Sequence, residues 1–229
     1  MIVIRGFRAI DEPDACHKFL VGHGKVLETI NVEVSSNKST WPDNPDVYVI
    51  VAEEVESHRI LGGARVHKAG KFEMLPMEEA TYYMDGRISG LIQERAKEGT
   101  GEICGLWNSR EGAMSGIGAV FLTRAAVASA IHLNMTSLFA LCAPYTVKMA
   151  QEVGYQIETS VGNHGTFYYP KLDLVATAMF LPDLKSLQTA TFEERDKIME
   201  LRHLPNGRKT EIFRGKEIEL YFNLDFKNN

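Results

Sequence analysis

The stretch from Glu102 to His132 constrains the fold of this chain most strongly. It reads as a strand, a glycine-bearing loop and an apolar helix in direct succession. The strand is GEICGLWNS (101–109), the loop is REGAMSGIG (110–118), and AVFLTRAAVASAIHLN (119–134) follows. Alanines and long aliphatic side chains on most faces of the last segment predict a buried helix. Such a helix begins with unpaired N–H groups and the positive end of its dipole.

The loop between this strand and this helix is a candidate phosphate site. Glycine lets the backbone close around a phosphate without a clash at Cβ, and Arg110 adds a charge that a phosphate can pair with. The other interpretation is a strand-to-helix connection that needs glycine only for its turn. Both interpretations stay open, because glycine spacing alone is weak evidence.

The rest of the chain alternates between strand and helix patterns, which predicts a mixed α/β fold with parallel central strands and right-handed crossovers. Two short helices are expected within 12–33, since Gly22 and Gly24 interrupt the apolar pattern. Strands are expected at 1–8, 47–54, 59–68, 136–143, 154–161 and 166–181, and helical segments within 74–100 and at 144–153. After Pro182 a helix (191–202) and a hairpin (210–224) follow. We therefore expect a main domain at 1–181 and an extension at 182–229 that packs on it.

Composition excludes several classes of protein. The chain has 229 residues, 45% of them hydrophobic, and a formal net charge of -5, which offers no electrostatic footprint for nucleic acid. The three cysteines are far apart, which argues against a disulfide or zinc framework and favours a reducing, cytoplasmic setting. No histidine pair has the spacing of a zincin helix, so no metal is expected. No apolar stretch approaches the roughly 20 residues that span a membrane, and the first residues form a strand pattern rather than a signal peptide.

The order of elements and the loop together resemble the GNAT (N-acetyltransferase) superfamily. The segment EICGLWNSREGAMSGIGAVFLTRAAV is similar to its fourth strand, pyrophosphate loop and third helix, with Gly116 and Gly118 at the glycine positions. LFALCAPYTVKMAQEVGYQI resembles its next strand, helix and strand, and IVIRGFRAIDEPDACHKFL its opening strand and helix. The resemblance implies a strongly twisted mixed sheet of about seven strands with flanking helices, here followed by an α-β-β extension.

The resemblance also implies a donor and a place for it. An acyl thioester, acetyl-CoA or another acyl-CoA, would lie in a gap between the splayed strands 101–109 and 136–143, and an amine would attack it directly. The pantetheine arm would follow the backbone of the first strand, and the pyrophosphate would take N–H groups of the loop. The residues implied are Leu106, Trp107 and Asn108 for the arm and Arg110, Met114, Ser115, Gly116, Ile117, Gly118 and Ala119 for the pyrophosphate.

Two residues are candidates for proton transfer. Glu102 begins its strand where the family often has a general base, and the other interpretation is an exposed edge carboxylate. The family's helix tyrosine, which protonates the thiolate, would fall near Ala150, so Tyr145 is the substitute candidate; a packing or capping role is the alternative. His164 lies in a turn near where acceptors often bind, and it is also explained as a turn residue alone.

The first half of the chain also resembles one branch of this superfamily, the acyl-homoserine lactone and N-acyl amino acid synthases. Their pattern of a tryptophan, two aspartates, GxxR and a glutamate is matched at Trp41, Asp43, Asp46, Arg65 and Glu102. Trp41 and Arg65 would then bind substrate. The pattern ends on an arginine that this chain replaces with glycine at position 105, and the donor of these enzymes is an acyl carrier protein. The long 69–100 segment would cover a larger acyl pocket.

Three functions remain open on the sequence. The first is an acyl-CoA-dependent N-acyltransferase acting on a small-molecule or protein amine. The second is a long-chain synthase that uses acyl carrier protein and so needs a basic docking patch. The third is a degenerate acyl-CoA-binding module, which the missing helix tyrosine favours. The apolar side chains of the last hairpin could also pair an edge strand with a second copy of the chain, giving a homodimer.

Overall fold

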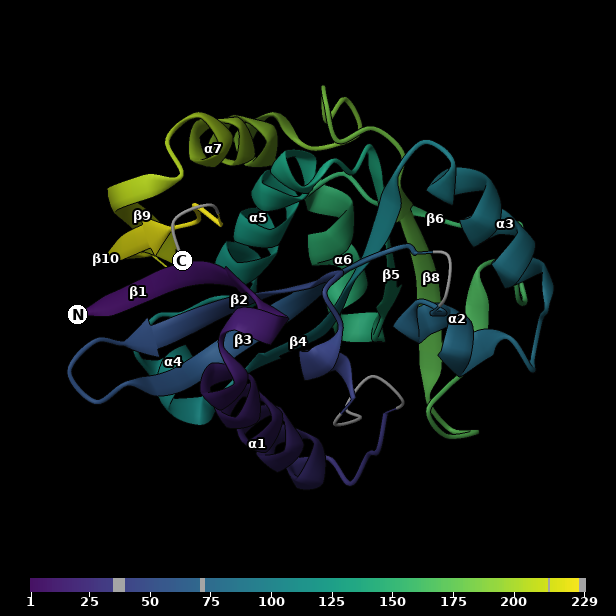
Figure 1. The fold of residues 1–229 in the computed structure, drawn as a ribbon, viewed down its shortest axis with the longest axis horizontal. Helices are drawn as coiled ribbons and strands as arrows, with labels where there is room; N and C mark the ends of the chain where they lie inside the picture. Colours follow the sequence, from purple (N-terminus) through teal and green to yellow (C-terminus); the bar gives the residue numbers. More distant parts are fainter. Residues whose placement is uncertain (35–39, 71–72, 214, 227–229) are drawn as a thin grey trace.

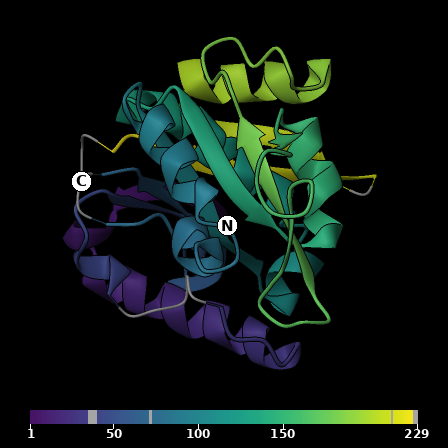
Figure 2. The same ribbon diagram turned by 90° about the vertical axis from the view of Figure 1, so that its right-hand side faces the viewer.

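The structure of the chain, a computed structural model, describes residues 1–34, 40–70, 73–213 and 215–226. One twisted sheet, ten-stranded over these residues, runs through the molecule with helices on both faces (Figures 1 and 2). Its strand order is β6-β8-β5-β4-β3-β2-β1-β10-β9, with β7 beside β8. This confirms the predicted GNAT-like mixed α/β class. The sheet has more strands than the seven expected, because the last hairpin continues it past β1 (Ile2–Arg8).

The strands keep close to the predicted ranges except near residue 170. Predicted strand 166–181 is instead two strands, β7 and β8, which pair with each other in antiparallel fashion. Pro170 follows β7, and a residue without an N–H cannot continue a sheet ladder. Predicted strand 154–161 is reduced to the two residues of β6. The strand bounds after β1 are β2 (Val47–Glu54), β3 (Arg59–Lys68), β4 (Thr100–Asn108), β5 (Ser137–Cys142), β6 (Gln156–Ile157), β7 (Thr166–Tyr168), β8 (Val175–Leu181), β9 (Asn206–Phe213) and β10 (Lys216–Asn223).

Helices cover the sheet in two groups (Figure 1). On one face α5 and α6 share a core with α7, and on the other α1 packs on β3 and β4, with α2 and α3 on β5 and β8. Short 3-10 turns add η1 (Ala9–Asp11), η3 (Trp41–Asp43) and η4 (Ile131–Leu133). The α-helices are α1 (Pro13–Thr29), α2 (Pro76–Thr81), α3 (Arg87–Ala96), α4 (Arg110–Met114), α5 (Ala119–Ala130), α6 (Pro144–Glu152) and α7 (Phe192–His203). None of the described helices has the length and apolar character that crossing a bilayer requires.

The two short helices expected within 12–33 are one continuous helix, so that prediction was wrong. Gly22 lies inside α1 and faces the indole of Trp107, where a Cβ would come within 2.2 Å of Cη2. The glycine therefore serves a close approach of helix to sheet, and it does not end the helix. Tertiary packing outweighs the helix propensity that glycine lacks, a deficit of about 1 kcal/mol.

The extension is joined to the rest of the molecule by the sheet and by a buried ion network. Strand β10 pairs in parallel with β1, and β9 forms the edge of the sheet beyond it. Arg124 of α5 is 4% exposed; its guanidinium donates to Glu194 of α7 at 2.6 Å and to Glu211 of β9 at 3.1 Å. Helix α5, which follows the glycine loop, is thus held between the sheet and the extension.

Candidate active site

The central sheet opens between β4 and β5. The two strands pair in parallel only from Thr100 to Glu102 on one side and from Ser137 to Phe139 on the other. Beyond these residues β4 continues with β3 and β5 with β8, so the two strands diverge. The gap that the family resemblance implied between these strands is therefore present.

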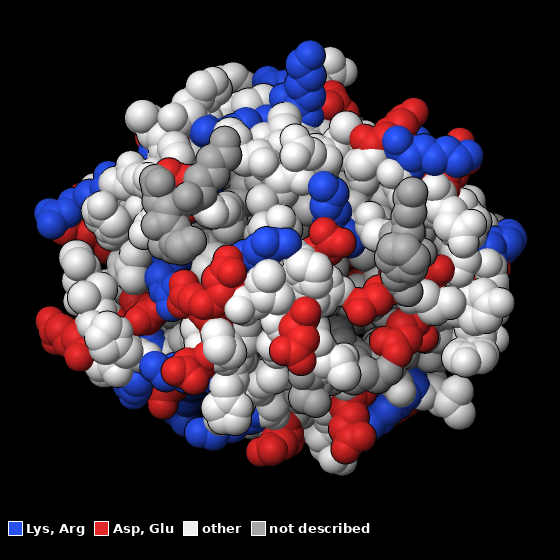
Figure 3. Space-filling model, in the orientation of Figure 1, with Lys and Arg blue, Asp and Glu red and all other residues white. Residues whose placement is uncertain are grey.

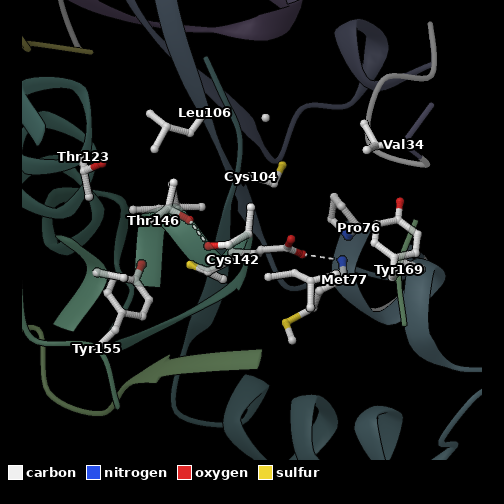
Figure 4. Close-up of a pocket in the computed structure, with 18 of the residues that line it drawn as sticks. Val34, Pro76, Met77, Cys104, Leu106, Thr123, Cys142, Thr146, Tyr155 and Tyr169 are labelled. Atoms are coloured by element: carbon white, nitrogen blue, oxygen red, sulfur yellow. Dashed lines mark hydrogen bonds between the residues drawn. The ribbon is translucent and has the colours of Figure 1, made fainter. Parts of the chain in front are cut away.

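The gap between β4 and β5 contains a cavity of about 200 Å³. One wall comes from α5, α6 and the turn after α6, and the opposite wall comes from α1, α2 and the segment after β7. Figure 4 shows the side chains of both walls facing the space between the strands. The lining includes Thr123, Thr146, Ala150 and Tyr155 on the first wall, His23, Leu27, Val34, Pro76, Met77 and Tyr169 on the second, and Glu102, Cys104, Leu106, Ala140 and Cys142 on the strands.

A β-bulge shapes the β4 side of the cavity. The register against β3 shifts between Gly63 and Arg65, so that Gly105 and Leu106 together oppose a single residue. Gly105 has a φ of +57°, and a Cβ there would lie 3.0 Å from the Arg65 guanidinium. A bulge bends its strand and redirects the next side chains. Because of the bulge, consecutive residues of β4 line the cavity. Gly105, which stands where the synthase pattern has arginine, lies against the Arg65 guanidinium.

Glu102 lies where the two strands part. Its carboxylate accepts the backbone N–H of Met77 at 2.7 Å, and the residue is 1% exposed (Figure 4). Burial raises the pKa of this carboxyl to about 8, against the opposing effects of the Met77 hydrogen bond and the Arg65 charge. The alternative of an exposed edge carboxylate is wrong for Glu102. Near neutral pH the group is poised to exchange a proton, as a general base requires.

Trp41, Arg65 and Glu102, far apart in the sequence, lie on one face of the sheet. The Arg65 guanidinium sits over the Trp41 ring at 4.6 Å and over Phe19 at 5.7 Å, a cation–π arrangement. Arg65 is 1% exposed, and its charge acts on Glu102 and Cys104. It opposes Cys104 in the β3–β4 register, so it stands directly behind the cavity wall.

The two aspartates of the synthase pattern do not join this group. Asp43 is exposed in η3, and the Asp46 amide donates to the Asn44 side chain in the turn that leads into β2. Both residues therefore belong to the turns that precede β2, and aspartate is common in such turns.

The glycine loop is more structured than the sequence predicts. Helix α4 forms within it, with the Ser109 hydroxyl accepting the Gly112 N–H at its start. The amides of Ser115, Gly116 and Ile117 donate to carbonyls of α4. Among the described residues, the amides of Gly118, Ala119 and Val120 at the start of α5 have no acceptor. The open N–H groups of this segment are thus fewer than the sequence suggested, and they lie at its end.

The hairpin of the extension covers the glycine side of this loop. A Cβ at Gly116 would lie 2.9 Å from Ile218, and one at Gly118 would lie 2.6 Å from the Phe213 ring. These two glycines are therefore explained in part by packing against the hairpin. Of the other residues expected here, Arg110 and Met114 are exposed, and Asn108 holds the loop by donating to the Ile117 carbonyl at 2.9 Å.

Two remaining candidates lie at or beyond the edge of the cavity. Tyr145 lines its mouth with 81% of its surface exposed. His164 is exposed in the turn before β7 with a φ of +51°, and it is not part of the cavity lining. Trp107 is buried against α1 and does not line the cavity either.

The structure adds cavity residues that the sequence did not single out. His23 faces the cavity from α1, and Tyr155 reaches it from the turn after α6. A lone histidine or tyrosine in an apolar segment gives no signal of this kind. Cys104 and Cys142 also line the cavity, and burial raises the pKa of these thiols to about 12 and about 11, as expected of packing groups rather than nucleophiles.

Comparisons with known proteins agree with this architecture. No protein-family model matches the sequence, and no curated protein does. Among solved structures, FeeM, an N-acyl amino acid synthase from uncultured soil microbes, has a TM-score of 0.62 at 15% identity and covers 86% of this chain and 98% of its own. MesI, a CoA-dependent acyl-homoserine lactone synthase, has a TM-score of 0.57 at 16% identity over 89% and 97%. An acyl-CoA N-acyltransferase from Pseudomonas aeruginosa has a TM-score of 0.52 at 12% identity over 79% and 99%. At identities this low, the structural similarity establishes the fold alone, and this fold is that of the GNAT acyltransferases.

Proposed function

We propose that this GNAT-fold chain is an N-acyltransferase that moves an acyl group from acyl-CoA to an amine by direct attack. The observation that carries the proposal is the cavity between the diverging strands β4 and β5, with a buried carboxyl, Glu102, where they part. A thioester held there would meet walls on both sides of the sheet. Donor and acceptor can then approach from opposite faces and react as neighbours, which removes much of the entropic barrier.

The donor is assigned to the side of α5 and α6. Past Glu102, the edge of β4 that faces β5 has no strand partner among the described residues. The amides of a pantetheine arm can pair with such an edge along Leu106, Trp107 and Asn108. The unpaired N–H groups at the start of α5 then suit the carrier's phosphates, because a helix N-terminus favours anions.

The acceptor is assigned to the side of α1 and α2, next to Glu102. The carboxylate form of Glu102 can take one proton from an ammonium group that arrives there and later release it to solvent. The transfer frees the nitrogen lone pair for attack on the thioester carbon. With the carboxyl's pKa at about 8, kcat/KM should rise with pH to a plateau above that value. Glu102→Gln should lower kcat roughly 100-fold to 10,000-fold and remove this limb of the pH profile.

A long-chain synthase is the second candidate, and a specific observation favours it. Trp41, Arg65 and Glu102 come together as the synthase resemblance implied, and α2 places Pro76 and Met77 on an apolar wall suited to an acyl chain. An acyl carrier protein is acidic and needs a basic surface to dock. On the face in Figure 3, basic side chains are scattered among acidic ones, without a continuous basic patch.

Thermal unfolding with acetyl-CoA, a long-chain acyl-CoA and CoA alone separates these functions. A ligand that binds only the native state raises stability by about 2.7 kcal/mol at 100 times its Kd. A shift with all three supports an acyltransferase for short chains, and a shift with the long chain alone supports the synthase. Binding without release of CoA thiol for any amine or amino acid would identify a degenerate binding module. No shift with any ligand would overturn the donor site.

Two further proposals concern the setting of the protein. Three free cysteines without a disulfide suit the cytoplasm. Strand β9 ends the sheet as an edge strand with Ile212 71% exposed, so a second copy could pair there as a homodimer. Light scattering of the wild type and of Ile212→Lys tests the dimer, which should dissociate in the variant.

A further inference from the structure

The hydroxyl of Tyr155 is a buried polar group that faces the cavity. The residue is 3% exposed, and its hydroxyl has no hydrogen-bond partner among the residues that the structure describes. Figure 4 shows it pointing from the wall of α6 toward Cys142 and Thr146. Buried hydroxyls in native proteins nearly always have a partner, so an exception calls for an explanation.

The position of this hydroxyl is fixed by the end of helix α6. Gly154, with a φ of +109°, turns the chain after the helix, and the Tyr155 amide donates to the Ala150 carbonyl at 2.9 Å. Ala150, itself 4% exposed, lines the same wall and leaves room above its small side chain. The tyrosine ring packs within the main core cluster. Tyr155 is therefore held at the wall of the cavity by the end of α6 and by its packing in the core.

A thiolate in this cavity is poorly solvated, and the same burial acts on the two cysteines of its lining. Burial raises the pKa of Cys104 to about 12 and that of Cys142 to about 11, even though the Arg65 charge favours the Cys104 thiolate. A thiolate that leaves an acyl thioester in the same space would meet the same lack of solvation. Such a leaving group requires a proton as the carbon–sulphur bond breaks.

We propose that Tyr155 is the catalytic acid that gives this proton to the departing sulphur, an inference that rests on the proposed acyl transfer. The amine nitrogen forms the new C–N bond, and the C–S bond breaks with its electron pair on sulphur. The phenolic proton moves to that sulphur and gives the free thiol. The nitrogen releases one proton to solvent and the Tyr155 phenolate takes one from solvent, so the net change converts amine and thioester into amide and thiol. Tyr155 regains its proton when the products leave.

The surroundings of Tyr155 suit a donor that must stay protonated until the bond breaks. Burial raises its pKa well above the usual value, and Cys142 and Glu102 act in the same direction. Glu102 lies where β4 and β5 part, so acid and base face the same cavity from different elements. Tyr145, the candidate from the sequence, is at the open mouth with 81% of its surface exposed, where water can supply a proton without it.

The test compares Tyr155→Phe with the wild type and with Tyr83→Phe, a tyrosine 94% exposed and outside the cavity lining, as the matched control. Each protein is assayed with an acyl-CoA and with the same acyl group carried on 4-nitrothiophenol, whose thiolate leaves without a proton. We expect Tyr155→Phe to lower kcat with acyl-CoA roughly 100-fold to 10,000-fold, with KM changed little. With the aryl thioester its rate should stay within about threefold of wild type, because general acid assistance contributes only where the leaving group needs it. Tyr83→Phe should match wild type with both donors.

Three results would contradict this assignment in different ways. Full activity of Tyr155→Phe with acyl-CoA would show that the tyrosine donates no proton. An equal loss with both donors would assign it a structural role, which the unfolding temperature checks independently. That temperature should equal or exceed the wild-type value, since the change removes only an unpartnered hydroxyl. A wild type that turns over no thioester with any amine would instead refute the proposed function itself.

Discussion

Replacing Glu102 with glutamine should change how the free energy of unfolding depends on pH. Burial raises the pKa of this carboxyl from 4.5 to about 8, while the Met77 N–H and the Arg65 charge act in the opposite direction. The native chain therefore binds this proton more tightly than the unfolded chain does. The stability that the proton contributes is full below about pH 4.5 and is lost as the pH rises through 8.

The size of the effect follows from that difference. One pKa unit corresponds to about 1.4 kcal/mol, so the span from 4.5 to about 8 gives roughly 5 kcal/mol at most. About 2 kcal/mol of it falls between pH 6.5 and 8. The range from pH 6.5 to 8 reports the effect of Glu102 most cleanly. Burial lowers the pKa of His67, so its contribution to the free energy of unfolding changes below pH 6.5 and with the opposite sign.

Urea denaturation at pH 5, 6.5 and 8 measures the effect, with the fluorescence of the two buried tryptophans as the probe. Glutamine keeps an acceptor for the Met77 N–H but cannot ionise. Wild type should lose about 2 kcal/mol relative to Glu102→Gln between pH 6.5 and 8. Glu98→Gln, an exposed carboxylate just before the same strand, is the control and should differ from wild type by the same amount at every pH. A constant difference for Glu102→Gln as well would refute a protonated, buried carboxyl.

Three substitutions test the packing that positions the site. Gly22→Ala brings a Cβ within 2.2 Å of the Trp107 ring and should cost about 1–3 kcal/mol of unfolding free energy in urea titrations. Gly105→Ala meets a positive φ and the Arg65 guanidinium at 3.0 Å, so it should cost about 1–3 kcal/mol and also lower kcat, which a thiol-release assay would show. Arg124→Met leaves buried Glu194 without its cation and leaves Glu211 with Lys197 alone, so it should cost about 3–5 kcal/mol in the same titrations, whereas an unchanged stability would mean that the ion network is dispensable.

The sequence predicts the architecture because local patterns and their order are visible in it. The apolar strand pattern at 47–54, the turn after it and the returning strand at 59–68 indicate the hairpin. Pro144 and Gly154 mark the start and end of α6 as expected. The glycine-bearing loop indicates the strand–helix unit that opens the sheet. These signals come from residues that are close together in the sequence, so they can be recognised without knowledge of the fold.

What the sequence misses depends on contacts between distant segments. Gly22 looks like a helix breaker until Trp107 is placed against it. Gly116 and Gly118 look free for phosphate until Ile218 and Phe213 of the extension are placed against them. Tyr155 gives no local signal at all, since only the folded chain shows its hydroxyl without a partner at the cavity. The synthase resemblance named Trp41, Arg65 and Glu102 together, and the structure brings them to one face of the sheet, where Glu102 alone of the three lines the cavity.

The structure of the chain in complex with a thioether analogue of acyl-CoA tests the central claim most directly. The account predicts that the analogue's sulphur lies between Leu106 and Cys142 where β4 and β5 diverge, with Glu102 and Tyr155 on either side of the reacting carbon. A ligand seated anywhere else on the molecule, or a cavity without ligand at saturating concentration, would contradict it.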